Sequence, residues 1–242
     1  MPSETVGRVD PGKLGVLHTY TGTQLGPPET WPVSGGGYPD SLALAILDTI
    51  FSVGANYDRV VLPLLRRYRD HRRAMRADPA RDGARELADA INVAGGPDAF
   101  ADAGILDNHQ RAWRRKTAPL KTAAALHAAT AFVAEGINST SQFVAATATD
   151  SVAVERVWRT TPGQRSRTAV GWDYLRILAG GESVKADTMI RRYVAAALRP
   201  DYPGIAVAAD EAKALVQALA SQMDVRVSLL DHAIWAHQRT QR

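Results

Sequence analysis

From residue 41 onward, apolar residues recur every three or four positions, the spacing that places them on one face of a helix. Strict alternation of apolar and polar residues, which would indicate strands, is scarce. The pattern therefore predicts an all-α protein. We expect helices, with one short helical turn at 141–146, over Ser41–Val53, Tyr57–Met75, Ala80–Asn92, Pro97–Ala103, Thr122–Glu135, Ser141–Ala146, Asp150–Thr160, Thr168–Leu178, Asp187–Leu198, Ala208–Ala220 and Val225–Gln238.

Helix-capping side chains support several of these starts. Ser41, Asn56, Asp150 and Ser166 each precede an apolar run, and their side-chain oxygens can accept hydrogen bonds from the first free N–H groups of a helix. Pro63 lies about two turns into the second segment, where its missing N–H must kink the helix or move its start.

The first 40 residues have a different composition. They contain 8 of the 19 glycines and 6 of the 13 prolines. Because both residues interrupt regular structure, we expect this segment to be rich in loops rather than helical.

Composition narrows the function classes. The chain has 242 residues, of which 45% are hydrophobic, and no cysteine, which excludes disulfides, zinc ribbons, cysteine nucleophiles and iron–sulfur clusters held by thiolates. No stretch has the apolar length of a membrane span or a signal peptide, so we expect a cytoplasmic protein with no membrane partner. The net charge of +4 and the pI near 9.5 suit a polyanionic partner.

One segment, Asp150–Val194, carries candidate chemistry. It contains a helix, a tight turn at Pro162–Gly163, a second helix, and a third helix after two glycines. The N–H groups that begin the second helix can bind a phosphate, and Arg165 and Arg167 add fixed positive charge there. A simple helical corner with solvated arginines is the alternative at this stage.

Two linked motifs in this segment resemble a known family. Residues 161–169 read Thr-Pro-Gly-Gln-Arg-Ser-Arg-Thr-Ala, and residues 185–190 read Lys-Ala-Asp-Thr-Met-Ile. They resemble the hairpin and the aspartate motif of the helix-hairpin-helix (HhH-GPD) DNA glycosylases of the endonuclease III type. Residues 230–239 are similar to the last helix of that family, and residues 42–57 resemble its early helix pair, so the resemblance spans residues 40–240.

The resemblance implies a two-lobed helical fold. The central domain would cover residues 41–180, with the helix-hairpin-helix at 150–179. The second lobe would combine residues 1–40 with residues 181–242. Double-stranded DNA would bind across the cleft between the lobes, and the protein would act as a monomer that associates with the nucleoid when bound to DNA.

The resemblance also implies roles for individual residues. Asp187 would be catalytic, because a carboxylate beside the sugar stabilises positive charge as the base leaves and can orient the attacking water. Asp187 is also a good helix N-cap, and the two roles are compatible. The expected DNA contacts are Pro162, Gly163, Gln164, Arg165, Ser166, Arg167, Thr168 and Lys185. The expected base pocket or wedge residues are Asn56, Tyr57 and Trp172.

Departures from the family pattern refine this expectation. Arg165 replaces the second hairpin glycine, and Gly54 stands where relatives carry a glutamine that fills the gap left by the flipped base. Arg167 replaces the lysine that forms a Schiff base in bifunctional members, and a guanidinium cannot serve as that nucleophile. Lys185 and Lys121 are the remaining amine candidates, although each is better explained as a surface or phosphate-contacting lysine. We therefore expect no lyase step and no cofactor.

These observations predict a monofunctional DNA glycosylase of the base-excision type. It would hydrolyse the N-glycosidic bond of a damaged or modified base flipped from duplex DNA. The alternative is a non-catalytic helix-hairpin-helix DNA-binding protein, and a helical scaffold that binds only proteins is a third possibility. Two basic runs, Arg66–Arg73 and Arg111–Lys116, are candidates for contacts along the phosphate backbone, although a solvated helix face explains the first run equally well.

Overall fold

The regular structure of the protein is helical. The computed structural model describes residues 9–32, 37–102, 104–165 and 169–241. Within these residues the only β-type pairing is an isolated antiparallel bridge between Arg111 and Leu120. The predicted all-α class is therefore confirmed. None of the helices in the described residues is long and apolar enough to cross a membrane.

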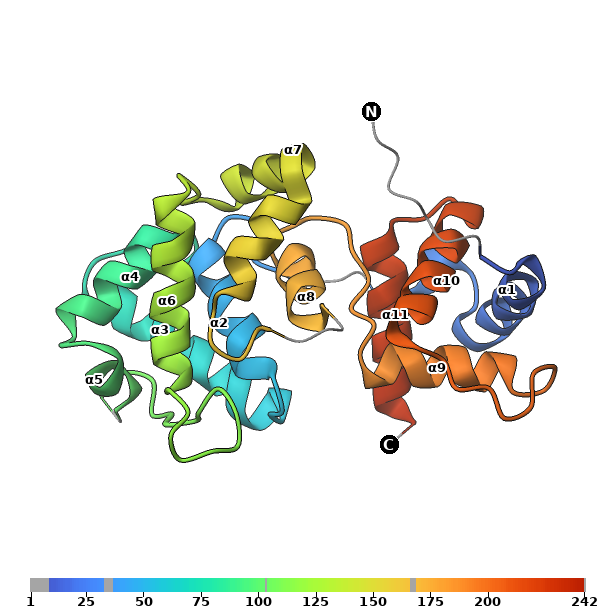
Figure 1. Ribbon diagram of the computed structural model, residues 1–242, viewed down its shortest axis with the longest axis horizontal. Coiled ribbons are helices and arrows are strands. Elements are labelled where there is room, and N and C mark those ends of the chain that lie inside the picture. The colour runs from blue at the N-terminus through green and yellow to red at the C-terminus, as the bar shows by residue number, and fades with distance from the viewer. Residues whose placement is uncertain (1–8, 33–36, 103, 166–168, 242) are drawn as a thin grey trace. The chain divides into compact units, whose positions relative to one another are not determined.

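The chain divides into two compact units, which are described separately. The central unit is Gly36–Gly181, and the terminal unit combines Met1–Gly35 with Glu182–Arg242. Each unit has its own hydrophobic core. Figure 1 shows the helices of both units along the chain.

The central unit is built around one buried helix. Helix α2 (Leu42–Ser52) is buried from Leu42 to Phe51, as expected for a segment that is apolar except for Asp48 and Thr49. It contacts α3, α4, α6 and α8. The other helical elements of the unit are η2 (Tyr57–Val61), α3 (Leu62–Ala74), α4 (Ala84–Val93), α5 (Pro97–Ala101), α6 (Lys121–Ala134), α7 (Thr140–Arg159) and α8 (Val170–Leu178).

The terminal unit packs an N-terminal helix against three C-terminal ones. Helix α1 contacts α9, α10 and α11, so the two ends of the chain share one core. Its helical elements are α1 (Pro11–Leu25), η1 (Pro28–Thr30), α9 (Thr188–Leu198), α10 (Ala209–Gln222) and α11 (Val227–Thr240).

Helix α1 shows that the expectation of a loop-rich N-terminal segment was wrong. Asp10 caps the helix through its side chain, and Pro11 occupies the first turn, where its missing N–H costs nothing. One of the glycines that argued against a helix lies at a close contact, since a Cβ atom on Gly12 would be 2.8 Å from the hydroxyl oxygen of Tyr202. Tertiary packing thus stabilises a segment whose composition disfavours helix.

The boundaries of α7 and α8 can be compared with the expectation. Helix α7 is kinked at Asp150, whose backbone angles are non-helical (φ −149°, ψ 84°), so the predicted helix start at this residue is confirmed. The predicted turn at 141–146 belongs to the first half of α7, which begins at Thr140 and is longer than expected. The Asp150 carboxylate still accepts a hydrogen bond from the Ala153 N–H, so it caps the second half of α7. Helix α8 begins at Val170 with Ala169 in the capping position, whereas the proposed cap Ser166 lies outside the described residues.

Pro63 lies at the start of α3, directly after the π-helical turn η2. The proline therefore moved the start of the α-helix, one of the two outcomes expected from its missing N–H.

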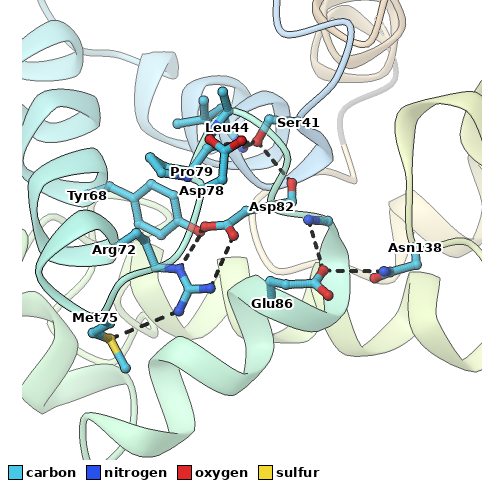
Figure 2. Close-up of polar contacts among 12 residues, drawn as sticks. Ser41, Leu44, Tyr68, Arg72, Met75, Asp78, Pro79, Asp82, Glu86 and Asn138 are labelled. Carbon is cyan, nitrogen blue, oxygen red and sulfur yellow. Dashed lines mark hydrogen bonds and ion pairs between the residues drawn. The ribbon is translucent and has the colours of Figure 1, made fainter.

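A buried ion pair fixes the turn between α3 and α4 (Figure 2). The Arg72 side chain donates two hydrogen bonds to the Asp82 carboxylate, at 2.7 and 3.1 Å, and the Tyr68 hydroxyl donates a third at 2.7 Å. The backbone carbonyl of Asp82 accepts from the Ser41 hydroxyl. This cluster joins α3 to the beginning of α2 through groups that are almost entirely buried.

Candidate functional site

The hairpin between α7 and α8 contains a tight turn that depends on glycine. Gly163 has φ +85°, a conformation that side chains with a Cβ rarely adopt. The Gln164 N–H donates to the carbonyl of Thr161, which closes the turn. The backbone conformation that the Pro-Gly sequence predicted is therefore present. Ser166, Arg167 and Thr168, which were also expected to contact DNA, lie outside the described residues.

The described hairpin residues face in different directions. Arg165 and Gly163 are exposed, and Pro162 is half-buried. Gln164 is only 8% exposed, and its side chain lies against Gly171 of α8, where an added Cβ atom would clash with the amide oxygen. Arg165 is therefore the described hairpin side chain best placed to reach a phosphate, whereas Gln164 supports the turn from inside.

A basic loop lies directly beside the hairpin. A Cβ atom on Gly163 would lie 3.0 Å from the carbonyl oxygen of Ala112, so the two segments are in close contact. The loop is ordered by backbone hydrogen bonds from Ala112 to Pro119 and from Lys121 to Gln110. Its exposed side chains include Trp113 and the cations Arg111, Arg114, Arg115 and Lys116.

Buried Lys121 connects this loop to a third segment. Its ammonium group donates to the carbonyls of Phe51 and Val53, at 3.1 and 2.8 Å, and to the side chain of Gln110 at 3.1 Å. The cation therefore satisfies carbonyls at the C-terminal end of α2, where the helix dipole favours positive charge. Lys121 has a structural role here and is not an exposed amine.

Together these contacts define a three-loop surface on the central unit, made of residues 53–57, 110–117 and 160–165. The three segments contain five Lys or Arg residues and no Asp or Glu, although Asp58 directly follows the first segment. A surface with this charge attracts polyanions and raises their local concentration. The second basic run of the sequence therefore belongs to the same surface as the hairpin.

The first basic run is largely committed to other contacts. Arg72 pairs with buried Asp82, Arg67 donates to the carbonyl of Leu106, and Arg69 lies over the ring of Tyr38. Arg73 pairs with Asp70 at the surface. This run mainly stabilises the fold.

Burial lowers the pKa of Lys121 to about 8, which gives a testable pH dependence. The folded state binds the Lys121 proton less tightly than the unfolded state does. Burial of the charged ammonium therefore lowers the free energy of unfolding below pH 8, and this loss of stability disappears as the pH rises toward 10.5. The shift corresponds to about 3 kcal/mol. We expect wild type to gain up to this much stability relative to Lys121→Met between these pH values, measured by urea denaturation. A difference that does not change with pH would contradict the burial effect.

Two of the predicted pocket residues, Asn56 and Tyr57, belong to the three-loop surface but differ in environment. Asn56 is exposed and caps η2, its side-chain oxygen accepting from the Arg59 N–H. Tyr57 is half-buried and donates its hydroxyl to the Asp48 carboxylate at 2.8 Å. Gly54 is exposed with φ +67°, so the position that carries a glutamine in the resembling family offers no side chain here.

Asp48 is the centre of a buried hydroxyl cluster that sequence reasoning missed. Its carboxylate is fully buried and also accepts hydrogen bonds from Tyr38 at 2.8 Å, Tyr174 at 3.0 Å and Ser52 at 2.7 Å. Burial, together with the Asp48 charge, raises the pKa of Tyr57, so the phenol remains a donor. A lone acidic residue within an otherwise apolar helix was the sequence signal for this cluster.

The Asp48 cluster predicts a structural effect for Tyr57. Replacing Tyr57 with phenylalanine removes one donor to a buried charge, and we expect the free energy of unfolding to fall by about 2 kcal/mol. Urea denaturation at neutral pH would measure this loss. Unchanged stability combined with weakened DNA binding would instead place Tyr57 in the DNA contact.

Trp172 lies within the core of the central unit. It is 3% exposed and its ring packs edge-on against Phe143 at 5.5 Å between centroids. Within the central unit, Trp172 therefore packs in the hydrophobic core.

Asp187, in the terminal unit, is the N-cap of α9. Its Oδ1 atom accepts hydrogen bonds from the N–H groups of Met189, at 2.8 Å, and Ile190, at 3.3 Å. No hydrogen bond to Oδ2 occurs within the part of the chain that the structure describes. The expected capping role is confirmed, and half of the carboxylate remains for a second role.

The segment that precedes Asp187 is fixed to α11. The Lys185 N–H donates to the buried Asp231 carboxylate at 2.8 Å, and Glu182 accepts from the N–H and hydroxyl of Ser228. Val184 between them is fully buried. Asp231 thus positions the backbone next to Asp187. The sequence placed Asp231 in the helix that resembles the last helix of the family. It did not indicate that Asp231 accepts a hydrogen bond from the Lys185 N–H.

Comparison with known proteins gives a family but no function. Neither the curated proteins nor the solved structures include a match to this chain. One family model, described as a domain of unknown function (DUF8548), matches residues 16–239. That match includes both the three-loop surface and Asp187, and the chain belongs to the DUF8548 family.

Proposed function

We propose that the protein is a monofunctional DNA glycosylase that hydrolyses the N-glycosidic bond of a damaged or modified base. The observation that carries the proposal is a hairpin with an exposed, acid-free basic surface, followed in the chain by an aspartate with an available oxygen at the N-terminus of α9. The resemblance of residues 161–169 and 185–190 to HhH-GPD motifs supports the same function, with double-stranded DNA as the partner of a monomeric enzyme.

The three-loop surface supports the DNA-binding part of this function. Its five cations can neutralise phosphates, and each such contact releases counterions from the DNA. Gly163 supports this surface indirectly, because the absence of a Cβ atom lets the hairpin pack closely against Ala112 of the basic loop. Such contacts position the protein on DNA without reading the sequence.

Asp187 supports the chemical step. As the bond between the sugar C1′ and the base breaks, its electron pair leaves with the base and positive charge develops on the sugar. Water then forms a bond to C1′ and loses a proton, which the Asp187 carboxylate accepts or directs. The departing base takes up a proton from solvent, which balances the proton lost by the attacking water, so the products are a free base and an abasic sugar. The helix N-terminus at α9 favours the ionised carboxylate that this step requires.

The lysines argue against a lyase step. Schiff-base formation needs an accessible amine, but Lys121 is 4% exposed and donates to three acceptors. The hairpin position that holds a lysine in bifunctional enzymes is Arg167 in this sequence. Lys185, a half-buried residue of the terminal unit, is the remaining amine candidate. We expect strand cleavage to require alkali after base release, and cleavage without alkali would point to Lys185.

A non-catalytic DNA-binding protein on the same scaffold is the second candidate. The burial of Trp172 and the engagement of Tyr57 by Asp48 favour it, because both residues were expected to contact the extruded base. This candidate keeps the three-loop surface and assigns Asp187 only to capping.

One assay distinguishes these functions. Duplex oligonucleotides that carry single damaged, mismatched or modified bases are incubated with the wild-type protein, and strand breaks are measured with and without alkali. Breaks that appear only after alkali support a monofunctional glycosylase and identify its substrate class. Salt-sensitive DNA binding with no base release on any duplex would favour the non-catalytic candidate. Absence of DNA binding would reject both.

A further inference from the structure

Trp113 is unusually exposed for its residue type. Its side chain is 45% exposed, and it is the only aromatic residue among the large hydrophobic side chains that are exposed in the described chain. Trp31, Trp158 and Trp172 are buried in the two cores, at 5%, 1% and 3% exposure. A single exposed apolar side chain needs no partner by itself. The surroundings of Trp113 therefore decide whether it can serve as a binding site.

A hollow lies between Trp113 and the hairpin. It has a volume of about 420 Å³ and is lined by Trp113, Thr160, Pro162, Gly163 and Arg165. The lining combines an aromatic side chain with a proline, an exposed stretch of glycine backbone and a guanidinium group. The close contact between Gly163 and Ala112 fixes the two walls relative to each other.

The charges around the hollow indicate what enters it. Arg114, Arg115 and Lys116 follow Trp113 directly, and Arg165 forms part of the opposite wall. Residues 110–117 and 160–165 contain no carboxylate. A ligand with both a flat apolar part and negative charge is complementary to this arrangement, and a nucleotide has both.

We propose that Trp113 and this hollow form a stacking site for an unpaired nucleobase of DNA. The base stacks on the indole ring, as bases do on aromatic platforms of single-strand-binding proteins, while its phosphates lie among the flanking cations. The site would make the protein prefer DNA in which a base is already unpaired. The inference depends on the DNA-binding part of the proposed function and is independent of catalysis by Asp187.

Binding measurements on two DNA ligands test this site. One is a fully paired duplex, and the other is the same duplex with one additional, unpaired base. We expect wild type to bind the second duplex more tightly, and Trp113→Ala to lose about tenfold or more of its affinity for that duplex. Affinity for the paired duplex should change little, because phosphate contacts supply it. Trp113→Phe should retain most of the preference.

Control variants separate stacking from charge and from folding. Arg165→Gln should weaken binding to both duplexes and reduce its salt dependence. Val93→Ala, at a 72%-exposed side chain in α4, should leave both affinities unchanged. Circular dichroism should show the same helix content in all variants, because Trp113 is exposed. Addition of the unpaired-base duplex should also quench tryptophan emission in wild type and do so less in Trp113→Phe.

Each result decides the proposal. If Trp113→Ala binds each duplex with the same affinity as wild type, the proposed stacking site is wrong, although DNA binding is retained. If wild type binds neither duplex, the DNA-binding function and the stacking site are both rejected. Quenching of Trp113 by poly-glutamate, but not by DNA, would assign the hollow to an acidic protein partner and overturn the proposal.

Discussion

Asp187→Asn is expected to reduce base release by about 10²- to 10⁴-fold, the usual contribution of a positioned acid–base group. The amide cannot accept the proton of the attacking water, and it carries no negative charge to stabilise the sugar cation. The helix should survive, because asparagine caps helices about as well as aspartate and can still accept from the Met189 and Ile190 N–H groups. Single-turnover base release, with DNA affinity and thermal unfolding measured in parallel, would test this expectation.

Asp210→Asn is a matched control for that substitution. Asp210 is an exposed aspartate in the first turn of α10, in the same unit. Its replacement by asparagine removes one negative charge near a helix N-terminus, as Asp187→Asn does. We expect it to leave base release unchanged. Full activity in Asp187→Asn would limit Asp187 to its capping role. Loss of folding in Asp187→Asn would show that the cap depends on the charge and would call for Asp187→Ser as the next variant.

Asp82→Ala is expected to lower the free energy of unfolding by about 3–5 kcal/mol. The substitution leaves the Arg72 guanidinium buried without its carboxylate, and it also removes the acceptor of the Tyr68 hydroxyl (Figure 2). Burial and hydrogen bonding of this carboxylate make the effect much larger than for a surface pair. Denaturation in urea at neutral pH would measure the loss.

A surface ion pair on the same helix provides the comparison. Arg73 and Asp70 are 3.1 Å apart, with both side chains 63% exposed. Solvent screens this pair, so Asp70→Ala should cost less than about 1 kcal/mol. Replacing Arg72 and Asp82 together with methionine and leucine should recover much of the stability lost in Asp82→Ala, because no buried charge then remains unpaired. Equal effects of Asp82→Ala and Asp70→Ala would contradict the role assigned to the buried pair.

Much of the helical structure could be predicted from local sequence. Ser41 caps α2, Asn56 caps η2 and Asp187 caps α9, as the pattern of capping side chains indicated. The predicted start of α9 was recoverable because a cap and its apolar face lie within a few residues of each other. Helix α1 was missed because its glycines count against a helix locally, whereas its stability comes from contacts with α9 and α10.

The candidate site was predictable in part. The sequence indicated the tight turn at Gly163 and the basic character of residues 111–116. It did not indicate that Gln164 points inward or that Lys121 donates hydrogen bonds to carbonyls at the end of α2, because these contacts join segments that are apart in the chain. Whether a polar side chain is buried depends on the segments that pack over it, and the hydrophobic periodicity of the sequence does not contain this information.

The sequence by itself determined the all-α class, most of the helix positions and the basic character of the hairpin region, since these follow from hydrophobic periodicity, capping and charge within short windows. Tertiary structure alone decided that Asp48 gathers four hydroxyl groups and that Asp231 holds the segment leading to Asp187. It also placed Trp113 beside the hairpin. These arrangements join residues far apart in the chain, and only the packing of helices against one another brings such residues into contact.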